Sequence, residues 1–387
     1  MTTPSNDLDP RAREALRGVQ TYTPGKPIET VKRELGLTSV IKLASNENAL
    51  GPSPKAVAAL KRACDQLHRY PDAAYTTLKA AISKHTGIEP SSIAVGNGSD
   101  ELLVMALRAF VEPGEDIVVA EPTFLIYALQ GQVCGANVIR VPLSNLRYDL
   151  LAMRRAVTPQ TKLVFIANPD NPTGTYVTAK ELQTFLDSLP PQVVVVVDEA
   201  YYEFVDAKDY PRTLKLLERF PLIVTRTFSK AYGLAGLRVG YGFAQPRIVR
   251  ALEVVREPFN VNSLAAVAAC AALEDRAFLR RTLQLTRQGR GFIERELTAL
   301  GLRAVPSVTN FVLVEVGPKA VEIARRLLEQ GVIVREMTGW KLEGFIRMTV
   351  GTMPENRRAV QALRVALGIA RPSRAGRGAR RATSRPA

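Results

Sequence analysis

Cysteine and histidine are scarce in this sequence, and long apolar runs are missing. The 387 residues include three cysteines, at positions 64, 134 and 270, and two histidines. An odd number of widely spaced cysteines without a CxxC motif argues against a disulfide framework or a zinc site and favours the reducing cytoplasm. No run approaches the ~20 apolar residues that span a bilayer, and the first ten residues lack the basic stretch and apolar core of a signal peptide. We expect a cytoplasmic protein that holds no metal and does not enter a membrane.

Basic residues outnumber acidic ones, which gives a formal net charge of +15. The last 17 residues, 371–387, carry six arginines and no acid. This tail is rich in Pro, Gly, Ser and Ala, a composition typical of disorder. The rest of the positive excess is compatible with an anionic substrate, and we predict no nucleic-acid partner.

Short apolar runs rich in Val and Ile recur from residue 93 onward, separated by segments with helical periodicity. The runs do not alternate with polar residues, which is typical of strands buried on both faces of a parallel sheet. They lie at 93–95, 117–120, 163–167, 193–197, 222–224 and 239–243. This order predicts an α/β fold whose large domain is a doubly wound, mostly parallel sheet.

The predicted domain boundaries follow from the same pattern. Residues 1–45 are expected to form an N-terminal arm that packs with the small domain and holds a short helix at about 11–19. The large domain covers 46–261, and the Arg-rich tail covers 371–387. Between them, long helical stretches over 264–300 precede strand-like runs and a further helix, which suits a smaller α+β domain over 262–370.

Residues able to bind an anion follow the first predicted strand. Open α/β sheets bind ligands at the carboxyl ends of their strands, and here the strand leads into a Gly-containing loop and a helix. The hydroxyl of Ser99 and the N–H groups of Asp100 and Glu101 would lie at the helix N-terminus, where anions bind. Ser99 could also be a simple N-cap.

Residues able to bind a planar aromatic ligand follow the next three strands. Phe124 could stack on a ring, and Asn171, in a segment with two Asn/Asp-Pro turns, could bond a phenolic oxygen. Asp198 ends a five-valine run, where a carboxylate is costly unless it pairs with a cation such as a protonated pyridine nitrogen. Tyr201 lies three residues further on and could reach the ring hydroxyl.

Lys230 follows the fifth strand and explains what these groups could bind together. Lysine forms Schiff bases with carbonyl cofactors. The hydroxyls of Thr227 and Ser229 flank it, and Arg238 follows eight residues later, as a phosphate group requires. These strand ends together predict a site for pyridoxal phosphate.

The sequence resembles the fold-type-I aminotransferases that depend on pyridoxal phosphate, and within them the histidinol-phosphate aminotransferase group. The resemblance covers residues 20–365 and rests on motifs in the same order and spacing. They are Leu43-Ala-Ser-Asn-Glu-Asn48, Gly51-Pro-Ser-Pro54, Arg69-Tyr-Pro-Asp72, Gly98-Ser-Asp-Glu101, Asn168-Pro-Asp-Asn-Pro-Thr-Gly174, Asp198-Glu-Ala-Tyr201, Ser229-Lys230 through Arg238, and Arg347-Met-Thr-Val-Gly351.

The resemblance implies a role for each candidate residue. Lys230 would be the catalytic lysine, and the cofactor would be held by Ser99, Asp100, Glu101, Phe124, Asn171, Asp198, Tyr201, Thr227, Ser229 and Arg238. Tyr70 would reach the cofactor phosphate of the neighbouring subunit, which implies a homodimer. Arg347 would bind a substrate carboxylate, and Tyr22, Asn46 and Arg335 would lie near the distal end of the substrate.

The substrate remains open at this point. The resemblance favours amino transfer between histidinol phosphate and 2-oxoglutarate, giving glutamate, in histidine biosynthesis. Transamination of phenylalanine or tyrosine is the first alternative, since the segment 334–344 departs from the family pattern at Glu336 and at Trp340-Lys341. A decarboxylase of a phosphorylated amino acid uses a similar framework. A cofactor-sensing regulator would need a DNA-binding module, and the N-terminal arm is too short for a winged helix.

Overall fold

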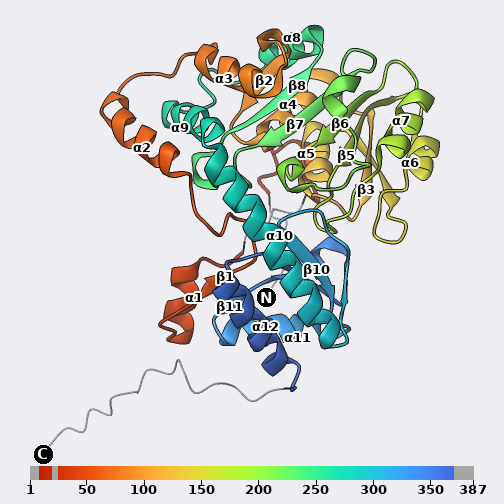
Figure 1. Cartoon of the computed structure of the whole chain (residues 1–387). Helices are drawn as coiled ribbons and strands as arrows, with labels where there is room; N and C mark the ends of the chain where they lie inside the picture. Colours follow the sequence, from red (N-terminus) through yellow and green to blue (C-terminus); the bar gives the residue numbers. More distant parts are fainter. Residues whose placement is uncertain (1–7, 20–24, 370–387) are drawn as a thin grey trace, which may run out of the picture. The chain divides into compact units, whose positions relative to one another are not determined.

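The computed structural model describes residues 8–19 and 25–369. The chain divides into two units (Figure 1). Among the described residues, the larger unit comprises 8–19, 47–284 and 306–310, and the smaller unit comprises 25–46, 285–305 and 311–369. The predicted boundary after residue 261 differs from this division, because the helix that follows it belongs to the larger unit. The predicted Arg-rich tail and the candidate Tyr22 lie outside the described residues.

A seven-stranded sheet forms the centre of the larger unit. Its order is β2-β8-β7-β6-β5-β3-β4, and β8 runs antiparallel to both neighbours while the other pairs are parallel. The strands are β2 (Ile93–Gly96), β3 (Asp116–Glu121), β4 (Asn137–Pro142), β5 (Thr161–Ala167), β6 (Val194–Asp198), β7 (Leu222–Thr227) and β8 (Gly240–Ala244). The mixed α/β fold with a large, mostly parallel sheet is therefore confirmed.

Six of the seven strands coincide with the predicted apolar runs, and β4 is the one the sequence pattern missed. β4 lies at the edge of the sheet and pairs only with β3. Most of its residues are exposed or half-buried, and it contains Arg140 and Pro142. An edge strand does not need to be apolar on both faces, so it leaves no continuous apolar run for sequence analysis to detect.

Helices accompany this sheet (Figure 1). They are α2 (Pro54–Ala63), α3 (Thr76–Thr86), α4 (Ser99–Phe110), α5 (Ile126–Cys134), α6 (Leu150–Ala156), α7 (Ala179–Ser188), α8 (Pro246–Val255) and α9 (Ser263–Glu274). Of these, α4, α5, α6 and α7 connect the successive strands from β2 to β6, and α2 packs on α9. Their starts follow local capping chemistry. Thr178 and Glu181 form a reciprocal capping box at α7, and the side chain of Asn262 accepts a bond from Ala265 N–H at α9.

One helix prediction differs from the structure. The helix expected at about 11–19 is only the short 3-10 helix η1 (Glu14–Leu16). The helical stretches expected over 264–300 are present as two helices, α9 and α10 (Arg276–Ala299), which meet at Asp275. A carboxylate oxygen of Asp275 accepts a bond from Phe278 N–H at 3.1 Å, which is N-cap chemistry that starts a new helix.

The smaller unit is an α+β structure of its own. Its antiparallel sheet has the order β12-β13-β10-β9, with β9 (Arg303–Ala304), β10 (Phe311–Glu315), β12 (Arg335–Glu336) and β13 (Phe345–Thr349). A separate parallel pair joins β1 (Ile41–Lys42) to β11 (Val332–Ile333). Helices α1 (Ile28–Leu35), α11 (Ala320–Glu329) and α12 (Met353–Ala366) complete the unit, and the strands bury Val312, Val314, Ile346 and Met348 in its core. Among the described residues, no helix is long and apolar enough to cross a membrane.

Strand register brings the predicted site residues of the larger unit to one rim of its sheet. Ala167 on β5, Asp198 on β6 and Thr225 on β7 are neighbours in the ladder. Thr227 pairs with Gly240 on β8, and Gly240 also pairs with Gly96 on β2. The loops that leave β2, β5, β6 and β7 therefore begin close together, as the strand-end argument expects.

Candidate active site

Asp198 is a buried carboxylate at the end of β6 that receives three hydrogen bonds. Tyr127 O–H donates to Oδ2 at 2.7 Å, while Thr225 O–H and Ala200 N–H donate to Oδ1 at 3.0 and 3.2 Å. Burial raises the pKa of Asp198 to about 6, and the bonds from Tyr127 and Thr225 act in the opposite direction. Such a carboxylate is suited to pair with a cation that enters its site.

Tyr127 and Thr225 were missed by the sequence analysis. Tyr127 lies on α5 and is fully buried, with its ring stacked on Phe165 at 5.0 Å and edge-on to Phe124 at 5.6 Å. No strand-end signal marks a residue inside a helix. Thr225 could have been found, because it lies within the β7 run and pairs in register with Asp198.

Lys230 lies in the loop after β7, on the same rim as Asp198. Its Nζ is 5.7 Å from the centroid of the Tyr201 ring, and Tyr201 is itself buried just beyond the end of β6. Two of the predicted residues, from the loops that follow β6 and β7, are thus brought together. Asn171, in the loop after β5, is half-buried, and Phe124 follows β3 against Tyr127.

The predicted phosphate-binding residues converge at the N-terminus of α4. The Arg238 guanidinium is 3.1 Å from Asp100 Oδ2 and 3.4 Å from Ser229 Oγ. Thr227 Oγ1 accepts a bond from Ser229 N–H at 3.1 Å. The structure therefore gathers four residues that the sequence places in two distant segments, 99–101 and 227–238.

Glycine is required at two positions of this cradle. Gly98 has φ +77°, and a Cβ there would lie 2.6 Å from Arg238 Nη2. A Cβ on Gly240 would lie 2.3 Å from the backbone nitrogen of Ser99. Both side chains would displace the backbone or the arginine that surround the start of α4.

Ser99 and Glu101 differ from their simplest interpretations. The N-cap of α4 is Gly98, and Ser99 is the first helical residue with no capping bond, so the interpretation of Ser99 as an N-cap is wrong. Its hydroxyl bonds no other described residue and lies beside the N–H groups that a helix N-terminus leaves without helical partners. The Glu101 carboxylate accepts bonds from Asn97 N–H and from the Asn260 side chain, both at 2.5 Å. Glu101 thus braces the loop, and its contribution to an anion site is its backbone N–H.

Tyr70 does not approach the rim of its own sheet through any described bond. Its side chain is 81% exposed, and its ring stacks on Phe259 with the centroids 4.6 Å apart. Phe259 has φ +56°, an unusual backbone conformation for an aromatic residue. Two aromatic rings held together at an exposed position suit contact with another protein surface.

The predicted substrate-binding residues Asn46, Arg335 and Arg347 belong to the smaller unit. Arg347, on β13, is buried and donates to Ala44 O at 2.9 Å, with its guanidinium 5.1 Å from the Phe311 ring. Asn46 is buried beside the same strand, where its N–H donates to Thr349 Oγ1 at 3.0 Å. The Arg335 guanidinium lies 4.7 Å from the Trp340 ring. These contacts fix the orientation of both arginines.

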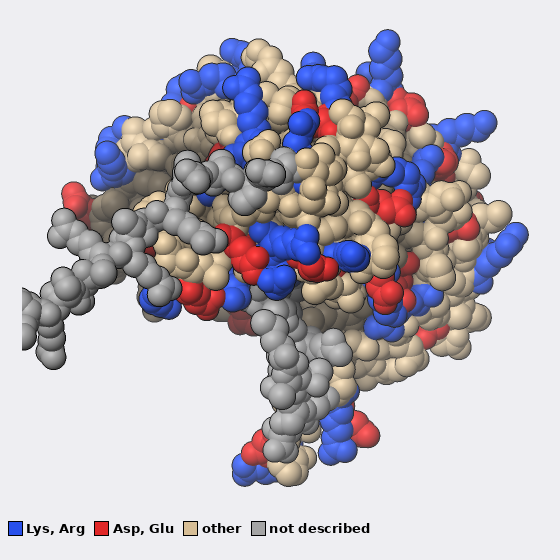
Figure 2. Space-filling view, turned by 90° about the horizontal axis from the view of Figure 1, so that it is seen from below, with Lys and Arg blue, Asp and Glu red and all other residues tan. Residues whose placement is uncertain are grey.

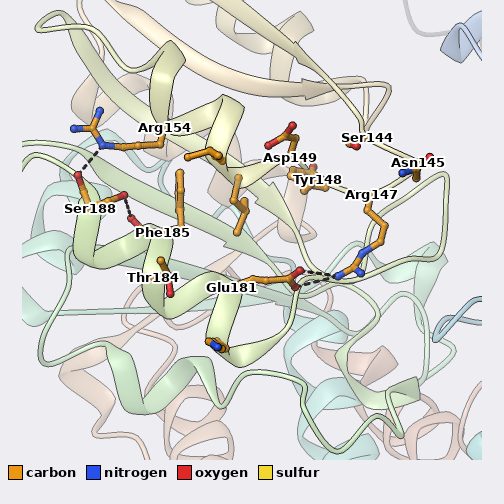
Figure 3. A pocket seen from close by; sticks show the side chains of 13 residues that line it. Ser144, Asn145, Arg147, Tyr148, Asp149, Arg154, Glu181, Thr184, Phe185 and Ser188 are labelled. Carbon is orange, nitrogen blue, oxygen red and sulfur yellow. Dashed lines mark hydrogen bonds and ion pairs between the residues drawn. The ribbon is translucent and has the colours of Figure 1, made fainter.

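A pocket of about 650 Å³ lies elsewhere on the larger unit, between the segment that leads into α6 and helix α7. Figure 3 shows Arg147 paired with Glu181 at one end of it and Arg154 bonded to the Ser188 carbonyl at the other. None of the predicted site residues lines it. The pocket is therefore separate from the Lys230 rim.

The residues at the rim fit the chemistry of pyridoxal phosphate. The buried Asp198 carboxylate suits the ring nitrogen, Asn171 and Tyr201 suit the ring hydroxyl, and Lys230 suits the carbonyl carbon. The helix N-terminus with Ser99, Ser229 and Arg238 suits the phosphate. Within residues 8–19 and 25–369, no group of three or more His, Cys, Asp or Glu residues is arranged to hold a metal ion.

Comparison with known proteins gives one consistent family. Residues 38–363 match the model of aminotransferase class I and II. A histidinol-phosphate aminotransferase of Moorella thermoacetica is 48% identical over 357 residues, which cover 92% of each chain. Histidinol-phosphate aminotransferase 1 of Nitrosococcus oceani is 46% identical over 92% of this chain and 96% of the relative.

A solved structure agrees in fold. The crystal structure of histidinol-phosphate aminotransferase from Sinorhizobium meliloti, in complex with pyridoxal-5'-phosphate, superposes with a TM-score of 0.85 at 30% sequence identity. The match covers 94% of this chain and 100% of that chain. From the sequence match, the shared fold and the lysine and carboxylate at one rim of the sheet, we conclude that this chain belongs to the aminotransferase class I and II family.

Proposed function

We propose that this protein is a pyridoxal-phosphate-dependent aminotransferase that exchanges the amino group between histidinol phosphate and 2-oxoglutarate. The observation that carries the proposal is the meeting of Lys230 and the buried Asp198 at one rim, in a chain 48% identical to a histidinol-phosphate aminotransferase. We also propose that it acts in the cytoplasm, where the free thiols of Cys64, Cys134 and Cys270 stay reduced.

The chemistry divides between the cofactor and the chain. Bound pyridoxal phosphate supplies an electron sink for the charge that develops at the substrate Cα. The Asp198 carboxylate holds the proton on the ring nitrogen, which keeps that sink cationic. The Lys230 amine would be the base that carries the proton of the substrate Cα. Ser99, Ser229 and Arg238 hold the phosphate while this happens.

The substrate preference rests on residues of the smaller unit. Arg347 would bind the carboxylate of 2-oxoglutarate or glutamate as a fixed planar donor. Arg335 would bind the phosphate of histidinol phosphate, with its guanidinium oriented by Trp340. Transamination of phenylalanine or tyrosine is the second candidate, favoured by the buried indole of Trp340 in the same segment, because an aromatic ring can pack on it.

The test is a single-turnover titration of the purified protein loaded with pyridoxal phosphate. Histidinol phosphate, phenylalanine and phosphothreonine are added separately while the absorbance of the bound cofactor is followed. We expect conversion to the amino form of the cofactor at low histidinol phosphate, with phenylalanine needing far more. A reversed preference assigns the protein to aromatic transamination, and release of carbon dioxide from phosphothreonine assigns it to the decarboxylases. Lys230→Ala is the control, since it removes both the covalent attachment and the base and should abolish turnover.

We further propose a homodimer in which Tyr70 completes the site of the neighbouring subunit. The exposed, stacked position of Tyr70 supports this, because it presents the phenol away from its own rim. Each site would then use Lys230 of its own subunit and Tyr70 of the neighbouring subunit. In a mixed dimer of the inactive variants Lys230→Ala and Tyr70→Ala, one site would therefore lack both residues and the other site would have both.

The test is to mix these two variants after reversible unfolding. We expect recovery of about a quarter of the wild-type activity, since half of the dimers are mixed and each has one intact site. Mixing that restores no activity, although the mixed dimers form, would show that Tyr70 acts within its own subunit. Undiminished activity of Tyr70→Ala alone would remove Tyr70 from the site.

A further inference from the structure

A chain of buried hydroxyl groups surrounds Asp170, a residue of the loop after β5 that the proposed chemistry does not use. Asp170 is fully buried. Its Oδ1 is 2.8 Å from Thr123 Oγ1, which is 2.6 Å from the Tyr148 hydroxyl. Its Oδ2 is 2.7 Å from Thr173 Oγ1. Among the described residues, no lysine or arginine contacts this carboxyl group.

The hydroxyl chain continues from Thr173 to a backbone carbonyl. Thr173 Oγ1 is 2.8 Å from Thr175 Oγ1, and Thr175 Oγ1 donates to Leu146 O at 2.9 Å. Leu146 and Asn145 both have φ > 0, at +61° and +51°, in the two-residue turn closed by Ser144 and Arg147. The network therefore begins at Tyr148 and ends at Leu146, and it links this strained turn to the Asp170 loop.

The protons of this network can be counted, because each hydroxyl has one. Thr175 donates its only hydroxyl proton to the Leu146 carbonyl oxygen, because a carbonyl can only accept. If Asp170 is ionised, Thr123 and Thr173 must both donate to it. The 2.8 Å contact between Thr173 and Thr175 then has no proton. If Asp170 carries a proton on Oδ2, it donates to Thr173, Thr173 donates to Thr175, and every contact is satisfied.

The surroundings of Asp170 also shift its protonation toward the neutral carboxylic acid. Burial raises the pKa of Asp170 to about 6, against the lowering effect of the bonds from Thr173 and Thr123. The titratable groups that face it are the phenols of Tyr148 and Tyr127, whose own pKa values are raised well above normal by burial. Beyond these phenols lies Asp198, a second acid. In the part of the chain that the structure describes, the side chains bonded to the Asp170 carboxyl group carry no positive charge.

The same network holds the segment that carries Asn171. Asp170 N–H donates to Thr175 O at 2.8 Å, and Gly174 N–H donates back to Asp170 O at 2.9 Å. Asn171 thus lies at the tip of a loop closed by its neighbours. Moving Thr173 or Asp170 would move the Asn171 amide.

We propose that Asp170 acts as a neutral acid that donates its proton to Thr173 and so positions Asn171 against the cofactor ring hydroxyl. Its part in positioning Asn171 rests on the proposed function, whereas the protonation of Asp170 does not. Asp170 is a positioning residue: it acts on the reaction only through Asn171. The two parts of the proposal can be tested on the protein without and with its cofactor.

The first test uses the protein without cofactor. The infrared difference spectrum between the wild type and Asp170→Asn at pH 5 should contain the carbonyl band of a protonated carboxyl group. Asp187→Asn, which changes an exposed carboxylate paired with Arg219, is the control and should lack it. A difference spectrum that shows only an ionised carboxylate at position 170 would overturn the proposal, whatever reaction the enzyme catalyses.

The second test compares two substitutions at the same position in the loaded enzyme. Asparagine keeps an acceptor for Thr123 and a permanent donor for Thr173, and it disturbs only the contacts from the backbone N–H groups of Asn171 and Thr173, the latter 3.3 Å long. Asp170→Asn should therefore keep kcat/KM within about threefold of the wild type. Asp170→Ala should lose about tenfold or more, because a small displacement of a positioning group is costly in rate.

A spectroscopic measurement separates positioning from general destabilisation. The pH at which the absorbance of bound pyridoxal phosphate changes depends on hydrogen bonds to the ring hydroxyl. It should shift in Asp170→Ala and Thr173→Val, and it should stay in place in Asp170→Asn and Thr173→Ser. If Asp170→Asn is folded and shifts as far as Asp170→Ala, an ionised carboxylate is required and the proposal is wrong. Failure to turn over histidinol phosphate would instead count against the substrate assignment alone.

Discussion

Asp170 and Asp198 follow neighbouring strands of one sheet, and both are buried acids whose pKa burial raises to about 6. Each lies within hydrogen-bond distance of at least three donor groups, but the two sets differ in how many protons they can give. The donors to Asp198 have no second described acceptor to serve, so Asp198 is ready to face a cation. Asp170 lies in a network that is one proton short unless the acid supplies it. The difference teaches that burial alone does not assign a role to a carboxyl group, because the available donors decide whether it serves as an anion or an acid.

The largest expected effect separates the two acids by the same substitution. Asp198→Asn should lower kcat/KM by about 10³-fold or more, because a neutral amide cannot hold the proton on a pyridine nitrogen. Asp170→Asn should change it little. Steady-state kinetics on both variants, with circular dichroism to confirm folding, makes the comparison. Equal losses in the two variants would contradict the distinction between anion and acid.

A smaller effect concerns stability and pH in the protein without cofactor. The folded-state pKa of about 6 exceeds the ordinary value of 3.8 for both acids. Each acid therefore contributes stability that is complete below pH 3.8 and is lost as the pH rises through 6. A shift of this size corresponds to about 3 kcal/mol for each group.

Denaturant unfolding between pH 4 and pH 8 measures this loss. Asp170→Asn and Asp198→Asn should each show a shallower decline than the wild type. Loading with pyridoxal phosphate should remove the part due to Asp198, because a bound cation lowers its pKa, and leave the part due to Asp170. If loading changes both parts equally, the two acids share one site, contrary to their different surroundings.

Sequence analysis found Asp198 and passed over Asp170 for a physical reason. An acid at the end of the apolar β6 run is conspicuous, because the strand is buried on both faces. Asp170 lies in a segment of turn residues, where Asp is ordinary. Its distinction depends on the hydroxyls of residues 123 and 173 that bond it and on residue 148, which bonds residue 123. That arrangement is a tertiary property.

The same limit explains the other successes and failures. A buried strand such as β5 can be recognised in the sequence as a continuous apolar run, whereas the more exposed edge strand β4 has no such run. The helical stretches expected over 264–300 are two helices, and Asp275 starts the second of them as its N-cap. The gathering of Asp100, Ser229 and Arg238 was inferred from the expected meeting of strand ends, and the contacts place them together. Tyr127 lies within a helix, so nothing in the sequence connects it to Asp198.

Tyr127 provides the smallest of the expected effects. Tyr127→Phe keeps the ring stacked on Phe165 and removes the O–H that donates to Asp198 Oδ2 at 2.7 Å. Loss of this donor should raise the pKa of Asp198 further and weaken its hold on the ring nitrogen. We expect kcat/KM to fall about tenfold at neutral pH, the equivalent of about 1.4 kcal/mol.

Tyr148→Phe is the matched control for Tyr127→Phe. It removes a phenol O–H that is hydrogen-bonded to Thr123, and it removes no hydrogen bond of Asp198. Tyr127→Phe should shift the acidic limb of the pH–rate profile upward, and Tyr148→Phe should not. Equal shifts in the two variants would mean that the two acids respond as one coupled pair, and the contrast between them would fail.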